Sequence, residues 1–302
     1  MTDIVIGLYS GYEKTKTPKG GIYYFLKTLR AVNKICKIFI LCEKEHQFEE
    51  LVQLCNETGT TLYDDFSVPE LYGFEKAPVM QRHRFIIIHD ILKKINTDSP
   101  INQVLVTDVN DVIFQRNPFK ILYQENALYC ATEINVLSDG NNSSSVLNME
   151  WIYEYSNYKN LNDYGVSLIN TNNFREKRVV CVGTIVGAYD SMLLFLDFYK
   201  KINSNIYVFL NDQAALNIYV YNHDHNPEQS SVITTPLEVS KILTLDKIQF
   251  ENISRDESGL LVNKNRDQYA IIHQIDRCNF EYMVNLAEYI ITGDYLKTSE
   301  NH

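Results

Sequence analysis

The stretch that decides the fold is VLVTDVNDVIF, residues Val104 to Phe114. An apolar run typical of a buried strand stops at Asp108, and a second carboxylate, Asp111, follows after the amide Asn110. In an open α/β sheet, ligands bind outside the carboxyl ends of the strands, where these acids would lie. Carboxylate oxygens suit Mg²⁺ or Mn²⁺, whose remaining ligand positions are often filled by substrate phosphates. The alternative is local: Asp108 caps the turn and Asp111 is a solvated loop acid.

Strand and helix patterns alternate on the amino-terminal side of this stretch. Apolar runs predict strands over 4–9, 35–41 and 60–63, and helical periodicity predicts helices over 23–32, 48–54 and 79–95. The last of these helices leads into the central strand. Such alternation is typical of a doubly wound sheet. The predicted fold class is therefore α/β, with a Rossmann-like, mostly parallel central sheet flanked by helices.

Length and composition indicate one folded domain. The chain has 302 residues, of which 45% are hydrophobic and 12% aromatic, enough for a substantial core. We expect a single domain over residues 1–295 and a frayed polar tail over 296–302. The formal net charge of −10 disfavours nucleic acid and anionic membranes as partners, because both require a basic face. A small anionic substrate would need a local positive group or a metal ion.

Cysteine spacing and hydropathy predict the compartment. None of the six cysteines forms a Cys-x-x-Cys pair and several lie in apolar runs, so we expect buried free thiols in a reducing environment. The amino terminus lacks the basic and long apolar segments of a signal peptide. No run approaches the roughly 18 apolar residues of a membrane-spanning helix. We therefore expect a soluble, cytoplasmic protein without a transmembrane segment.

Two later segments combine apolar patterns with candidate functional residues. The run Val179–Tyr189 predicts a strand that contains Gly183 and Gly187. A glycine inside a strand marks either the close approach of a ligand or a bulge. Asp212 lies in the segment Leu210–Asn217, where it is expected at the start of a helix. A carboxylate in that position can cap the helix or act as a general base, and the two roles are compatible.

Histidine and arginine residues complete the candidate set. The apolar strand that starts at Ala270 ends at His273, whose neutral imidazole would suit a Mn²⁺ site beside two carboxylates. A lone histidine would otherwise be a core or surface group. Arg82 and Arg84 lie two residues apart on the helix over 79–95 and cannot share a helix face. Either could face a bound anion, and the alternative for each is a surface ion pair.

In this order, the segments resemble the nucleotide-sugar glycosyltransferases of the GT-A fold. The resemblance spans about residues 79–280 and rests on Thr107–Phe119 with its Phe-Gln and Pro-Phe pairs, on the glycine strand, on Asp212–Gln213 and on His273–Arg277. Asn110 stands where the most similar branch of that family has an arginine. Cys181 and Val182 replace a polar residue and an alanine, so the hydrogen bond usually made to the sugar cannot come from that side chain.

The resemblance implies a metal-dependent GT-A type glycosyltransferase. It would move a hexose or deoxyhexose from a nucleoside-diphosphate sugar, UDP-sugars foremost, to a hydroxyl of a glycan or other acceptor. The metal, Mn²⁺ or Mg²⁺, would be held by Asp108, Asp111 and His273, with Asn110 as the alternative to Asp111. Asp212 would be the base of an inverting transfer and Glu133 the second candidate, whereas a retaining transfer needs neither. The donor would be bound by Tyr9, Arg82, Arg84, Asp108, Val109, Asn110 and Gly183.

Two other functions stay open from the sequence. A sugar nucleotidyltransferase shares the doubly wound core but normally has a glycine-rich basic loop after the first strand, which Ser10–Gly21 only faintly matches. A catalytically inactive protein that binds nucleotide sugars or acts as a scaffold would account for the altered acid motif and for the lost polar residue at Cys181. Metal-dependent hydrolysis of a nucleotide sugar separates the active enzyme from the inactive protein. The sequence is compatible with an oligomer.

Overall fold

The computed structural model describes residues 1–9, 21–67, 76–121, 124, 126–137, 139–140, 143–156, 174, 176–203, 211–222, 231–235, 239–245, 253–277 and 280–293. The expected tail over 296–302 lies outside these residues. So does the expected loop over 10–21, apart from Gly21, at which the first helix begins.

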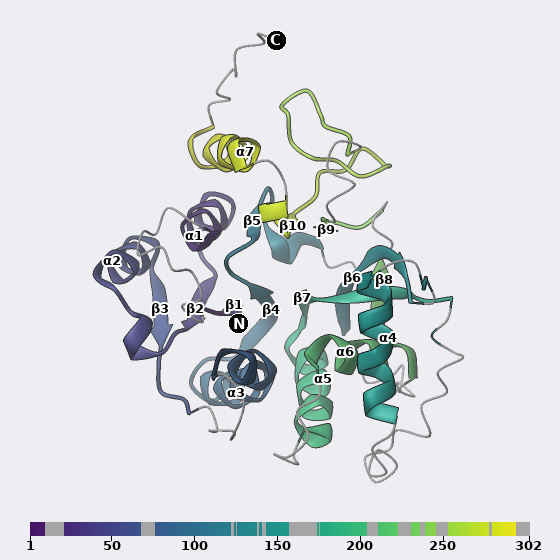
Figure 1. Ribbon diagram of the computed structural model, residues 1–302. Helices are drawn as coiled ribbons and strands as arrows, with labels where there is room; N and C mark the ends of the chain where they lie inside the picture. Colours follow the sequence, from purple (N-terminus) through teal and green to yellow (C-terminus); the bar gives the residue numbers. More distant parts are fainter. Residues whose placement is uncertain are drawn as a thin grey trace.

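A seven-stranded sheet forms the centre of the described structure, in the order β3-β2-β1-β4-β7-β6-β8 (Figure 1). Its strands are β1 (Thr2–Leu8), β2 (Lys37–Leu41), β3 (Thr60–Tyr63), β4 (Ile101–Asp108), β6 (Ala127–Val136), β7 (Arg178–Ala188) and β8 (Ser231–Thr235). The pairs β1-β2, β2-β3, β1-β4 and β6-β8 are parallel. Only β7 is antiparallel to its neighbours, β4 and β6. The predicted α/β class, with a Rossmann-like and mostly parallel sheet, is confirmed.

Helices cover both faces of the sheet, so that the molecule has three layers (Figure 1). One face carries α1 (Gly21–Val32) and α2 (Glu49–Thr58), and the other carries α3 (Lys76–Asp98), α5 (Tyr189–Ile202) and α6 (Asp212–Asn222). The helix α4 (Ser143–Ser156) packs on α6. Each face has its own buried core, one around Phe25 and Leu105 and the other around Phe85 and Val106.

A smaller sheet lies beside α1 and continues directly from the acid turn. Its strands are β5 (Val112–Phe114), β10 (Ile271–His273) and β9 (Ile242–Thr244), in the order β5-β10-β9. The carboxyl-terminal helix α7 (Phe280–Thr292) shares a third hydrophobic core with this sheet and packs against α1 (Figure 1). The stretch 104–114 therefore links the two sheets, because β4 belongs to one and β5 to the other.

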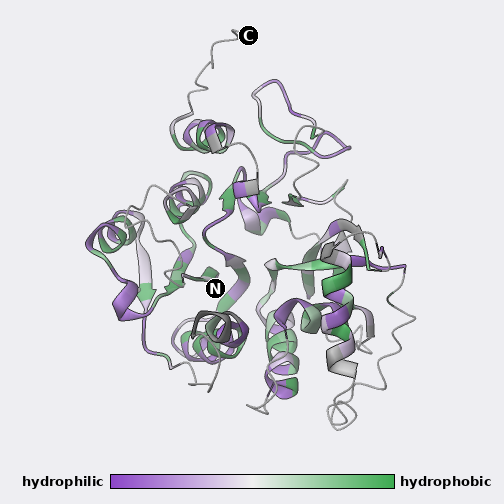
Figure 2. Ribbon diagram, in the orientation of Figure 1, coloured by the Kyte–Doolittle hydropathy of each residue, from purple (hydrophilic) through white to green (hydrophobic). Residues whose placement is uncertain are grey.

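Hydrophobic residues gather on the central strands and on the inner sides of the helices (Figure 2). In β4 the run Val104–Val106 is buried on both faces, which explains why it is apolar throughout and does not alternate. In α1, Ile22, Phe25 and Leu29 recur at helical spacing and are all buried. Gly59 ends α2 in the left-handed conformation, φ 59°, in which glycine has no steric cost.

Two expected boundaries differ from the structure. The strand expected over 35–41 begins at Lys37, because the side chain of Ile35 is 85% exposed and has no core to join. The sequence also predicts a strand over Ala127–Ala131, with Thr132 and Glu133 following its end. The observed strand continues to Val136, because β6 pairs with β7 beyond a bulge, so both residues lie inside the strand.

In the part of the chain that the structure describes, each helix is too short or too polar to cross a lipid bilayer. The cysteines Cys36, Cys42, Cys55, Cys130 and Cys181 are buried and unpaired, as expected. Burial raises the pKa of the Cys36 thiol to about 11, so this thiol is protonated near neutral pH. Cys278 lies outside the described residues.

Candidate active site

The pairing of the small sheet brings the candidate metal ligands together. Asp108 is the last residue of β4, and Asp111 directly precedes β5. β10 is antiparallel to β5, and the register places His273 opposite Val112, next to Asp111. The amide of Ile275 donates a hydrogen bond of 3.0 Å to the carbonyl of Asp111. Main-chain pairing thus holds the histidine strand against the acid turn.

The three side chains converge on one point. Nε2 of His273 lies 3.3 Å from Oδ2 of Asp108 and 3.5 Å from Oδ2 of Asp111. The imidazole is buried, with 2% of the side chain exposed, and its Nε2 makes no hydrogen bond to any described residue. One carboxylate oxygen from each aspartate and the imidazole nitrogen lie within 4.8 Å of one another. A buried nitrogen without a hydrogen bond, facing two carboxylates, is the arrangement that a divalent cation would satisfy.

Arg84 links this centre to a third carboxylate. Its guanidinium makes an ion pair with Asp108 and another, of 2.9 Å, with Oδ2 of Asp212. The side chain is 10% exposed and its guanidinium lies 5.0 Å from the ring centroid of Phe85. Arg82, two residues earlier on α3, has a carbonyl that accepts a hydrogen bond from the hydroxyl of Tyr199. Of the two candidate arginines, the structure places Arg84 between the acids.

The charges of the site shift the pKa values of its members. Burial alone would raise the pKa of Asp108, but Arg84 and His273 outweigh burial and hold that pKa well below its usual range. Burial raises the pKa of Asp212, which Arg84 opposes only in part. Burial lowers the pKa of His273, yet Cys181, Asp111 and Asp108 together raise it well above its usual value. Without a bound cation, these shifts favour a protonated imidazole at His273 beside an ionised carboxylate at Asp108.

Gly183 is the residue of β7 that faces the centre. A Cβ at this position would lie 2.2 Å from Cε1 and 2.4 Å from Nε2 of His273, and 2.7 Å from Oδ2 of Asp108. Any side chain there would displace the imidazole or the carboxylate. The sequence left a choice between a bulge and the close approach of a ligand. The strand is irregular at this point, because β7 pairs with β6 at Ile185 and next at Val180. The group that approaches Gly183 is the imidazole of His273.

The other predicted donor contacts lie beside the acid turn. Tyr9 follows β1, is 2% exposed, and donates its amide to the carbonyl of Leu41 over 2.9 Å. Val109 is buried, and a Cβ at Gly7 would lie 2.3 Å from its Cγ1. The turn residue Asn110 has a buried Oδ1 with no hydrogen bond to a described residue.

Gly21 brings the first turn of α1 against the acid turn. A Cβ on Gly21 would lie 1.4 Å from the main-chain oxygen of Asn110, so only glycine fits there. The beginning of α1 and the residues after β4 are therefore in direct backbone contact.

A pocket of about 240 Å³ lies on the side of Asp212, and both candidate bases line it. Its lining residues are Glu133, Leu147, Asn148, Trp151, Asn211, Asp212, Gln213 and Gln274. Trp151, the one tryptophan of the sequence, contributes to this wall. The mixture of amides, two carboxylates and an aromatic ring suits a polar, hydroxyl-rich ligand.

Asn211 does most of the helix capping that Asp212 was expected to share. Its Oδ1 accepts hydrogen bonds from the amides of Gln213, at 2.9 Å, and Ala214, at 3.3 Å. Oδ1 of Asp212 accepts from the amide of Gln213 at 2.8 Å, while its Oδ2 faces Arg84. One oxygen of Asp212 therefore fixes the start of α6 and the other belongs to the charged site.

Gln213 organises the pocket, a role that the sequence did not indicate for it. Its Nε2 donates to Oδ1 of Asn148 at 2.9 Å and approaches Oε1 of Glu133 at 3.4 Å. Its Oε1 accepts from the amide of Val182 at 3.5 Å. The sequence did single out Gln213 as the second member of the Asp-Gln pair. Its hydrogen-bond partners could not be predicted, because they come from elements far apart in the sequence.

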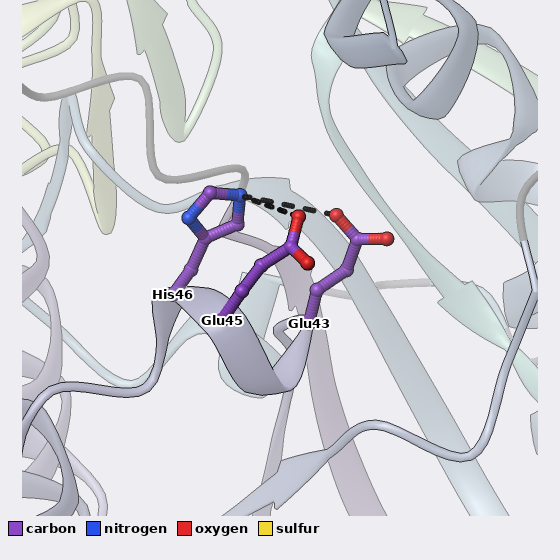
Figure 3. Close-up of side chains that lie close together, drawn as sticks. All are labelled: Glu43, Glu45 and His46. Atoms are coloured by element: carbon purple, nitrogen blue, oxygen red, sulfur yellow. Dashed lines mark ion pairs between the residues drawn. The ribbon is translucent and has the colours of Figure 1, made fainter.

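A second group of acids and a histidine lies outside this site (Figure 3). Nε2 of His46 is 3.8 Å from Oε2 of Glu43 and 3.9 Å from Oε1 of Glu45. All three belong to the 3₁₀ helix Lys44–His46 and the residue before it, and the Glu45 side chain is 61% exposed. Ion pairs between side chains of one short surface segment contribute little free energy in water, so we assign no site to this group.

Fold and site together define an α/β protein whose central strand delivers two acids to a buried histidine and arginine. No protein-family model and no curated protein matches the chain. Among solved structures, the apo structure of the bifunctional glycosyltransferase WbbM is similar over 90% of this chain and 45% of WbbM, with 14% identity and a TM-score of 0.48. The chain thus spans less than half of that protein. An active-site mutant of LgtC is similar over 99% of this chain and 98% of its own, with 12% identity and a TM-score of 0.47.

Proposed function

We propose that the protein is a metal-dependent glycosyltransferase of the GT-A type. It would transfer a hexose or deoxyhexose from a nucleoside-diphosphate sugar, UDP-sugars foremost, to a hydroxyl of a glycan or other acceptor. The observation that carries the proposal is the convergence of Asp108, Asp111 and His273 at the carboxyl end of β4. This is the edge at which open α/β sheets bind their ligands.

The donor atoms fit a divalent cation. Two carboxylates and a neutral imidazole are ligands that Mn²⁺ accepts, and Mg²⁺ accepts the carboxylates. When bound, such an ion would neutralise the negative charge that builds up on the departing diphosphate. Arg84 adds a fixed positive charge on the same side, because its ion pair with Asp108 holds the guanidinium at the edge of the centre. The diphosphate of the donor would therefore contact both the cation and the guanidinium of Arg84.

Asp212 and Glu133 are the proposed bases for an inverting transfer. Both line the pocket of about 240 Å³, and Asp212 reaches the metal centre through Arg84. The raised pKa of Asp212, caused by burial, makes its carboxylate a stronger base than an exposed aspartate. It would accept the proton of an acceptor hydroxyl that enters the pocket. In a retaining transfer the same carboxylates would only orient the acceptor.

The single-domain extent over residues 1–295 belongs to this proposal. It is supported by the packing of α1 against both β5 of the small sheet and α7. The test is release of a nucleoside diphosphate from a panel of nucleotide sugars, with Mn²⁺ and with chelator. We expect one donor to be hydrolysed slowly with Mn²⁺ and not with chelator. Pyrophosphate release from a nucleoside triphosphate and a sugar phosphate would instead identify a nucleotidyltransferase. No turnover of any donor would indicate an inactive binding protein.

A further inference from the structure

The strand β7 holds the ring of His273 at two points. Sγ of Cys181 lies 3.5 Å from Nδ1 of His273, at the opposite side of the ring from the two aspartates. Gly183, two residues further on, leaves room for Cε1 and Nε2. Residues 181 and 183 therefore both contact the same ring. The sequence Cys-x-Gly therefore defines where the imidazole can lie.

Both partners of this contact are buried. Cys181 and His273 are each 2% exposed, so water does not compete for the hydrogen bond at Nδ1. Of the two ring nitrogens, Nδ1 has a partner in Cys181, while Nε2 faces the carboxylates without a hydrogen bond to the described residues. The ring is thus oriented by sulfur at one nitrogen and left open for a ligand at the other.

A histidine binds a metal through the nitrogen that carries no proton. If Nε2 is the ligand, the ring proton must lie on Nδ1, where it needs an acceptor. A thiol sulfur can accept such a hydrogen bond, although more weakly than a carbonyl or carboxylate oxygen. In this chain, Cys181 stands where the resembled glycosyltransferases have a polar residue. Here the thiol of Cys181 contacts Nδ1 of His273.

We propose that Cys181 is a positioning residue: its sulfur accepts the Nδ1 proton of His273 and so presents Nε2 to a divalent cation held by Asp108 and Asp111. This inference rests on the proposed metal site and extends it to a residue that touches neither metal nor substrate. Cys181 acts through His273 alone.

The test measures Mn²⁺ affinity of the full chain from the electron paramagnetic resonance signal of free Mn²⁺. We expect Cys181→Ala to weaken Mn²⁺ binding about tenfold or more, as for other partners of metal-bound histidines. Cys181→Ser should recover part of the loss, because a hydroxyl can also accept the proton. Cys55→Ala is the matched control: Cys55 lies on α2, is 2% exposed like Cys181, and makes no hydrogen bond to His273. It should bind Mn²⁺ as the wild type does.

A second measurement detects the tautomer directly. In the Mg²⁺-loaded protein, long-range ¹H–¹⁵N correlations of His273 should show the proton on Nδ1 in the wild type and a change in Cys181→Ala. If the alanine variant does not fold, Cys181→Val fills the same space and repeats the test. Equal Mn²⁺ affinity and an unchanged spectrum in the variants would overturn the inference alone. Wild-type protein that binds no Mn²⁺ would overturn the metal site as well, so the two failures are distinguishable.

Discussion

Nε2 of His273 and Oδ2 of Asp108 lie 3.3 Å apart, although the two residues end strands of different sheets. β4 brings the aspartate from the central sheet, and β10 brings the histidine from the small sheet. Neither sheet holds the site alone. The pairing of β5 with β10 and the glycine at position 183 decide whether the two groups meet.

Arg84→Ala should destabilise the protein, because Asp108 and Asp212 would lose the cation between them. We expect the free energy of unfolding to fall by about 3 kcal/mol, near the lower end for a broken buried ion pair. Asp108 is 35% exposed, which limits the loss. Urea denaturation with chelator present measures the change in the free energy of unfolding. Arg84→Lys should lose less of this free energy, because the ammonium keeps the positive charge. It should not match the wild type, because it lacks the planar guanidinium that reaches both acids.

Arg82→Ala is the control for this prediction, since it removes the same side chain two residues earlier on α3. Its loss of unfolding free energy should be smaller than that of Arg84→Ala. If the two variants lose the same amount, the ion pairs of Arg84 contribute no specific stability.

Gly183→Ala should weaken Mn²⁺ binding by about tenfold or more, the scale seen when the support of a metal-bound histidine is lost. The added Cβ would lie 2.2 Å from Cε1 of His273 and push the ring out of place. Titration calorimetry with Mn²⁺ measures the effect. In the matched variant Gly187→Ala, the new Cβ would lie 2.6 Å from the carbonyl oxygen of Ala127 instead. That variant should lose stability but keep its Mn²⁺ affinity, and the reverse pattern would contradict the account.

The raised pKa of His273 predicts how stability depends on pH without metal. A histidine whose pKa is higher in the folded state stabilises that state fully below its unfolded value, about 6.5. The stabilisation is lost as the pH rises through the higher folded pKa. The difference in unfolding free energy between wild type and His273→Gln, with chelator, should therefore shrink above about pH 6.5. With Mn²⁺ the trend should reverse, because binding displaces the proton. A difference independent of pH in both conditions would refute this prediction.

Asp212→Asn should lower the rate of metal-dependent donor hydrolysis by about 10² to 10⁴, the usual contribution of a general base. The amide keeps the size of the side chain and its contact with the amide of Gln213. Mn²⁺ affinity should stay near that of the wild type, which separates a lost base from a lost site. Glu133→Gln should have a smaller effect. If Glu133→Gln abolishes hydrolysis and Asp212→Asn does not, the assignment of the two bases must be exchanged.

Local sequence patterns were sufficient to predict the elements that carry the site. The strand ending at Asp108, the short strand Thr60–Tyr63 and the strand ending at His273 all occur where the apolar runs place them. Buried strands and amphipathic helices leave a clear periodic signal, so the α/β class followed from it. The grouping of Asp108, Asp111 and His273 came instead from the order of motifs in the resembled family.

Contacts between distant segments could not be derived from these patterns. Periodicity contains no information on the direction of β7 or on the separate small sheet, because both depend on pairing between distant residues. Gln103 of β4 pairs with Ala188 of β7, and Val112 of β5 pairs with His273 of β10. The choice between Arg82 and Arg84 depended on the rotation of α3 about its axis. The contact between Cys181 and His273 required the positions of β7 and β10 relative to each other.

The central claim is that Asp108, Asp111 and His273 hold a divalent cation that binds the donor's diphosphate. The most direct test is the melting temperature of the protein with a panel of nucleoside diphosphates, each with Mn²⁺ or with chelator. Ligands that bind the folded state raise it by mass action. We predict that one nucleoside diphosphate raises it only with Mn²⁺, that Asp108→Asn abolishes the shift, and that Asp98→Asn, at the exposed end of α3, retains it. An equal shift with chelator, or in Asp108→Asn, would contradict the claim.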